Sequence, residues 1–303
     1  MFKRMLLVLL GLGPCGLSAA EAPAAGAESE RAAFAAAAAQ FEGSLAFQQG
    51  EVKLPNGIAT LQIPAGFRYL DPPQAQRVLE DAWGNPDGKG TLGMIFPSDG
   101  PVIGDGGWGV VITYEEDGHV SDADADKIDY NELLTDMQKS LGEQNKERRD
   151  QGYAAIELVG WAARPHYDKA ERKLYWAKEL KFGDAAHNTL NYNIRILGRK
   201  GVLVLNAVSG MQELSKVEQD MRQVLAFANF TPGNRYQDFD GGVDKVAAYG
   251  LGALVAGGIA AKTGLLAKLL VLLLALKKAI VLGAVAVAGV VGKLLFGRKD
   301  QAN

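Results

Sequence analysis

The sequence predicts an α+β protein, an antiparallel sheet with packed helices, followed by C-terminal membrane helices. Residues 155–208 contain four strand-like runs separated by short turns. Helical patterns begin near residues 71, 129 and 215. From residue 246 to residue 296 the chain is apolar except for five lysines. Hairpins and helices in separate runs are typical of helices packed on an antiparallel sheet, and so long an apolar tract has no polar face to cover it in water.

The N-terminus has the pattern of a secretory signal peptide at residues 1–20. A basic pair precedes a short apolar run, and small residues follow, so we expect cleavage after Ala20. The only cysteine, Cys15, lies in this segment after Pro14, where a lipoprotein would have a small residue. An Ala-rich spacer at 21–43 follows, which is either a helix or a disordered segment.

Residues 44–233 form the predicted periplasmic domain. The run 51–63 reads as a hairpin, because Asn56 and Gly57 supply the positive φ angles of a type I′ turn. Asp71 is predicted to cap a helix that continues to Trp83. Strands are expected at 91–96 and 108–114, and Asp129 and Glu132 are expected to open a long helix.

A meander and a last helix complete this domain. Its strands are expected at 155–163, 173–182, 189–197 and 202–208. The last of them is apolar on both faces, which predicts a central strand covered on both sides. Ser215 is predicted to cap the final helix with Glu218. Residues 234–245 are expected to be a linker.

Residues 246–297 are predicted to be membrane-associated helices. The best spanning segment is 279–296, whose 18 residues include one charge, Lys293. The short basic tail 298–303 then lies in the cytoplasm and the domain in the periplasm. This arrangement predicts a bacterial inner-membrane location, with the lipid bilayer as a partner. Two alternatives stay open: a first crossing at 246–262 with a return crossing, and an apolar helical hairpin buried in a soluble protein.

The charge of the domain argues against nucleic acid as a partner. Of the 32 basic side chains nine lie outside residues 21–245, and of the 35 acidic side chains only Asp300 does, so this part has a formal net charge of about −11. Nucleic-acid binding relies on basic side chains that neutralise phosphates.

Five motifs together resemble one known family. They are Leu54–Gly57, Arg77–Pro86, Thr91–Pro97, Gly107–Val111 and Ala261–Lys268. The chain resembles uncharacterised bacterial membrane-anchored proteins described as predicted regulators of amylopullulanase, across residues 44–298. The family is a domain of unknown function, so the resemblance implies a topology and supplies no catalytic residue.

The acidic loop offers the one candidate metal site. Asp122, Asp124 and Asp126 alternate as calcium ligands do at the start of a calcium loop. However, Lys127 stands where such a loop needs glycine, and Leu133 stands at the position of the bidentate glutamate. The competing interpretation is a solvated acidic loop before a helix.

We therefore expect a non-enzymatic binding or regulatory module, with another envelope protein as its partner. No catalytic residue is assigned, and no cofactor is expected apart from the calcium ion considered above. The alternative is an envelope glycan hydrolase that uses an acidic pair from residues 115–129. A sensor of ions or envelope stress, acting through the acidic loop, is a third hypothesis.

Overall fold

The computed structural model describes residues 24–83, 89–104, 106–150, 152 and 154–257. The chain divides into two compact units, Met1–Ser44 and Leu45–Asn303. In the first unit, helix α1 (Ala24–Gly43) shows that the Ala-rich spacer is helical. Alanine has the highest helix propensity, which explains this local structure.

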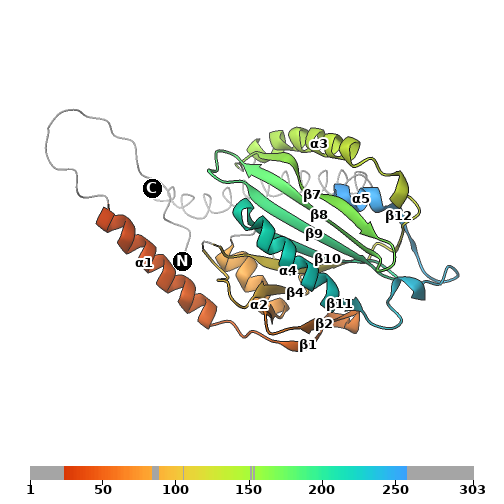
Figure 1. The fold of residues 1–303 in the computed structure, drawn as a ribbon, viewed down its shortest axis with the longest axis horizontal. Helices are drawn as coiled ribbons and strands as arrows, with labels where there is room; N and C mark the ends of the chain where they lie inside the picture. The colour runs from red at the N-terminus through yellow and green to blue at the C-terminus, as the bar shows by residue number, and fades with distance from the viewer. Residues whose placement is uncertain (1–23, 84–88, 105, 151, 153, 258–303) are drawn as a thin grey trace, which may run out of the picture. The chain divides into compact units, whose positions relative to one another are not determined.

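The second unit is built on a seven-stranded antiparallel sheet (Figure 1). The strands, in spatial order, are β3 (Phe67–Leu70), β4 (Gly93–Pro97), β5 (Gly109–Glu115), β10 (Val202–Gly210), β9 (Thr189–Leu197), β8 (Lys173–Phe182) and β7 (Ile156–Asp168). The predicted meander is confirmed. Strand β10 is the central one, and Val202, Leu203, Val204 and Leu205 are all buried, so both of its faces are covered as predicted.

A smaller sheet joins the start and the end of the domain. It contains β1 (Gly50–Lys53), β2 (Ala59–Ile63) and β11 (Ala228–Phe230), all antiparallel. The predicted hairpin exists, and Asn56 and Gly57 have φ angles of 62° and 63°. The predicted type I′ turn was wrong. The Gly57 amide donates a hydrogen bond to the Leu54 carbonyl at 3.0 Å across a tight turn, Pro55–Gly57. A proline with fixed φ favours this longer connection.

Helix α2 (Pro72–Arg77) and helix α3 (Tyr130–Asp150) begin where the sequence predicts. The Asp71 carboxylate accepts a hydrogen bond from the Gln74 amide at 3.1 Å. A π-helical turn, Val78–Ala82, continues α2. The Asp129 carboxylate accepts from the amides of Asn131 and Glu132 at 2.8 and 3.2 Å. Both carboxylates satisfy amides that have no partner within the helix.

Helix α4 (Leu214–Phe227) begins one residue earlier than predicted. A 3₁₀ turn, Met211–Glu213, leads into it, so Ser215 lies inside the first helical turn and makes no capping bond. The core of the first sheet face contains Val217, Met221, Val224 and Phe227 of α4, together with Tyr192, Ile194 and Ile196 of β9. The α4 residues among these recur at helical spacing, so the helix packs one apolar side on the sheet.

The second sheet face is covered by two segments that flank the acidic loop, β6 (His119–Ser121) and α3, and by the C-terminal segment that contains β12 (Val246–Gly250) and α5 (Leu251–Ala256). Strand β12 pairs in parallel with β6, and helix α5 follows it. Leu251, Leu254 and Val255 are buried with Leu174 and Trp176 of β8. Helix α3 lies along β7, and Gln138 and Asn145 donate to backbone carbonyls of that strand (Figure 1).

The first residues of the predicted membrane tract belong to the folded domain. Residues 246–256 form β12 and α5 inside the domain, where their apolar side chains are covered by protein. The predicted linker contains the turn Tyr236–Asp238 and also packs on the domain. The predicted signal segment, the spanning segment 279–296 and the basic tail lie outside the described residues. Within the part that the structure describes, no helix is both long and apolar enough to span a membrane.

Candidate functional site

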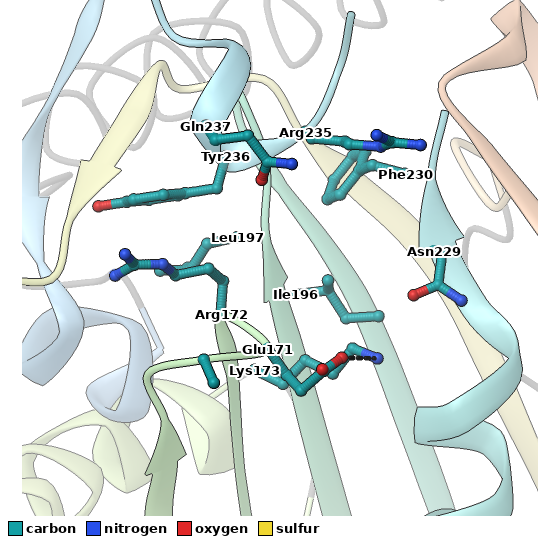
Figure 2. A pocket seen from close by; sticks show the side chains of 11 residues that line it. Glu171, Arg172, Lys173, Ile196, Leu197, Asn229, Phe230, Arg235, Tyr236 and Gln237 are labelled. Carbon is teal, nitrogen blue, oxygen red and sulfur yellow. Dashed lines mark ion pairs between the residues drawn. The ribbon is translucent and has the colours of Figure 1, made fainter. Parts of the chain in front are cut away.

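A pocket of about 320 Å³ opens at one end of the large sheet (Figure 2). Residues 170–173, 196–197, 229–230 and 235–237 line it. Its walls are thus the turn between β7 and β8, the end of β9, strand β11 and the segment 231–239, which we call the strap. Ile196 and Leu197, both buried, form an apolar base.

The turn between β7 and β8 has a specific backbone shape. The Asp168 carboxylate accepts hydrogen bonds from the amides of Ala170 and Glu171 at 2.9 and 3.0 Å. Arg172 has a φ angle of 57°, a left-handed conformation that is uncommon for residues other than glycine. Its carbonyl accepts from the Leu197 amide at 2.9 Å, which fixes the turn to the end of β9.

The strap is held by its own aspartate and by the turn between β9 and β10. The Asp238 carboxylate accepts from the amides of Gly233 and Arg235 at 2.8 and 2.9 Å. The Arg199 amide donates to the Asn234 carbonyl at 2.9 Å. These bonds fix the strap backbone and place Arg235, Tyr236 and Gln237 along the pocket (Figure 2).

A cluster centred on Asp122, which we call the Asp122 cluster, holds two of the lining residues, Arg172 and Tyr236. The hydroxyls of Tyr167 and Tyr236 donate to the Asp122 carboxylate at 2.8 and 3.1 Å, and Arg172 forms an ion pair with it. The Arg172 guanidinium also lies over the Tyr236 ring, 4.6 Å from its centroid. Burial raises the pKa of Asp122, but the hydroxyl bonds and the Arg172 charge outweigh it and hold this pKa below its ordinary value.

The other two cations of the pocket differ in their surroundings. The Lys173 ammonium is buried, donates to the Leu225 carbonyl at 2.6 Å and lies 3.5 Å from the Glu171 carboxylate. The Arg235 side chain is exposed. Among the described residues, no acceptor lies within hydrogen-bond or ion-pair distance of its guanidinium. Arg235 is therefore the pocket cation that is open to a ligand.

His119 packs against Tyr236, one of the residues that line the pocket. Its ring is stacked between Phe239, with centroids 4.0 Å apart, and Tyr236, with centroids 4.2 Å apart. Burial lowers the pKa of His119, although the backbone carbonyls of Arg199 and Gly198 and the charges of Asp122 and Asp244 act in the opposite direction. A neutral imidazole at β6 thus buttresses the Tyr236 ring that lines the pocket.

The family model for "Protein of unknown function (DUF2167)" matches residues 46–288. The chain belongs to this family. No curated protein matches the sequence.

Two solved structures are distantly similar to this DUF2167 chain. The cyanobacterial PsbP (CyanoP) from Synechocystis sp. PCC 6803 is 10% identical, with a TM-score of 0.34, covering 62% of this chain and 94% of that one. The Ran-binding protein Mog1p from Saccharomyces cerevisiae is 13% identical, with a TM-score of 0.33, covering 61% and 96%. Likenesses this distant carry no conclusion about function.

The three aspartates predicted to bind calcium have three different roles in this DUF2167 domain. Asp122 belongs to the Asp122 cluster, where donors occupy both carboxylate oxygens. Asp124 accepts from the amides of Leu251 and Gly252 at 3.1 and 3.2 Å and so caps α5. Asp126 is exposed. In the described part of the chain, no three His, Cys, Asp or Glu side chains converge as metal ligands.

The acidic segment 115–129 also holds backbone and tyrosine groups in place. Asp117 accepts from the Tyr249 hydroxyl at 2.8 Å, and Asp129 caps α3. No residue of this segment lines the pocket, although Asp122 contacts two that do.

Arg172, Arg235 and Tyr236 were not predicted as site residues. Arg235 and Tyr236 lie in the predicted linker. Two aromatic residues in this short segment, Tyr236 and Phe239, could have indicated that it packs on the domain.

Proposed function

We propose that the protein is an exported, membrane-anchored binding module of the bacterial envelope, which regulates a partner protein and takes a ligand in the pocket beneath the strap. The pocket carries this proposal. It joins an apolar base, two aromatic rings and amide and charged side chains in one concavity. Binding sites for small molecules typically combine an apolar lining with a few polar groups that orient the ligand.

The envelope location in this proposal rests on the sequence. A basic, apolar and small-residue pattern at residues 1–20 supports export, and the apolar segment 279–296 supports an anchor. The regulatory role rests on the resemblance to predicted regulators of amylopullulanase.

The geometry favours binding over glycan hydrolysis. Glycosidases use two carboxylates about 5–10 Å apart in a cleft. The pocket lining contains one carboxylate, Glu171, and this group faces Lys173. In the predicted acidic segment, Asp117, Asp122 and Asp124 accept structural hydrogen bonds.

The test is a crosslinked pull-down of the full chain from detergent-solubilised membranes, with partners identified by mass spectrometry. Gln237 is exposed at the pocket, so Gln237→Trp should fill it without disturbing the core. Gln144→Trp, on the exposed side of α3, is the matched control. We expect one reproducible partner with the wild type and the control, and its loss with Gln237→Trp.

Two results would contradict the proposal. Recovery of the wild type as a lone monomer would remove the partner. An unchanged partner with Gln237→Trp would remove the pocket from the interaction.

A further inference from the structure

The charges around the pocket do not cancel. Arg172, Lys173 and Arg235 line it, and Glu171 is the single acidic residue among its described lining residues. Arg172 is ion-paired with Asp122, and Lys173 lies 3.5 Å from Glu171. Among the residues that the structure describes, Arg235 has no counterion. A guanidinium presents a planar fork of donors that matches a carboxylate or a phosphate.

Two aspartates in and after the strap already have partners. Asp238 accepts from the amides of Gly233 and Arg235 itself. Asp244 pairs with Arg199 at 2.6 Å and accepts from the Asp240 amide at 2.8 Å. These bonds hold the carboxylates against the backbone, so the Arg235 guanidinium remains available to a group from outside.

The size and the base of the pocket limit the ligand. A volume of about 320 Å³ is at the low end of the roughly 300–1,000 Å³ of small-molecule sites. Figure 2 shows Ile196 between the strap side chains and the Glu171–Lys173 pair, so the base between the charged walls is apolar. Residues 21–245 have a formal net charge of about −11, which disfavours a polyanion by long-range repulsion.

We propose that this pocket binds a small organic anion, whose charged end meets Arg235 and whose apolar body lies over Ile196. The inference rests on the proposed function and names the ligand class of the same site. A carboxylate and a phosphate monoester share this chemistry. Gln237 and Asn229, which have amide side chains at the pocket, can add hydrogen bonds to either group.

Ligand-observed fluorine NMR on the full chain in a non-ionic detergent tests the inference. The probes are fluorobenzoate, fluorophenyl phosphate and the neutral fluorobenzamide. We expect both anions to bind, and fluorobenzamide to bind about tenfold more weakly, since a hydrogen bond to a charged group is worth more than a neutral one. The stronger of the two anions identifies the natural group as carboxylate or phosphate.

Variants of Arg235 locate the charge. Arg235→Gln should weaken anion binding about tenfold, and Arg235→Lys should retain most of it. Arg149→Gln, an exposed arginine of α3, should leave it unchanged. Because the Arg235 side chain is exposed, all three variants should melt like the wild type.

The outcomes separate this inference from the proposed function. If fluorobenzamide binds as tightly as fluorobenzoate and Gln237→Trp removes both, the anion class is wrong while the pocket remains a binding site. Anion binding that persists in Arg235→Gln and Gln237→Trp would place the site elsewhere and overturn the inference. No response to any probe would overturn it too, and the pull-down would then decide the proposed function by itself.

Discussion

Single aspartates of the acidic loop anchor segments that lie far away in the chain. Asp122 receives donors from Tyr167, Arg172 and Tyr236. Asp124, two residues later, receives the first amides of α5. A partly buried carboxylate is stable only with such donors, because its charge loses hydration. Two of the three aspartates that resemble metal ligands in the sequence, Asp122 and Asp124, therefore connect distant segments of the domain.

Asp122→Asn should destabilise the domain by roughly 2 kcal/mol, because it leaves Arg172 and two hydroxyls without a charged acceptor. The Asp122 side chain is 16% exposed and that of Arg172 32%, so the effect is smaller than for a fully buried pair. Asp126→Asn, at an exposed position of the same loop, should change stability by less than about 0.5 kcal/mol. Urea denaturation measures both. Equal effects would show that the Asp122 cluster contributes little.

His119 should make the domain less stable in mild acid. Its folded pKa is lowered from 6.5 chiefly by burial, so the unfolded chain takes up the proton first as the pH falls. The free energy of unfolding then decreases as the pH drops below about 6.5, until the folded pKa is passed. His119→Gln should flatten this part of the stability–pH curve, whatever its absolute stability. His187→Gln, at an exposed site, is the matched control, and the same slope in both variants would exclude His119 as its source.

Strand β12 and helix α5 show how an apolar element can serve either a core or a membrane. Gly118 permits their approach: its φ angle is 112°, and a Cβ there would lie 2.7 Å from the Lys245 carbonyl oxygen. Glycine has no Cβ and adopts this conformation without strain. The close approach lets β12 pair with β6 and directs α5 onto Trp176 and Leu174.

Leu254→Ala should cost about 3 kcal/mol, because Leu254 is 2% exposed in the core and its truncation leaves a cavity. Val246→Ala, at a residue that is 55% exposed, should cost less than about 0.5 kcal/mol. Denaturant titration of the full chain in detergent, followed by tryptophan fluorescence, compares the two. No difference between them would mean that α5 does not contribute to the stability of the domain.

On the scale of the whole molecule, the proposed attachment to a membrane depends on residues beyond the described part. Deletion of residues 279–303 should release the domain into the soluble periplasmic fraction, because the remaining chain lacks an uninterrupted apolar stretch of about 20 residues. Deletion of residues 21–43, of similar length, should leave the protein in the membrane pellet after alkaline extraction. Release by both deletions, or by neither, would contradict an anchor at 279–296.

Much of the second unit follows from local patterns. The sequence predicted the capping aspartates at 71 and 129, the meander and the central position of β10. Each of these features depends on neighbouring residues or on the order of apolar and polar residues along a strand. The short strands β3, β6, β11 and β12 were missed. Each has three to five residues, too few for a period, and β11 and β12 pair with strands from the first half of the domain.

The sequence by itself determined the α+β class, the acidic character of the domain and the expectation of export and anchoring, because these depend on composition and periodicity. Only the tertiary structure decided the pocket. It brings together the turn before β8, the end of β9 and the strap, which are far apart in the chain. It also decided that residues 246–256 belong to the domain, because an apolar run reads the same whether protein or lipid covers it.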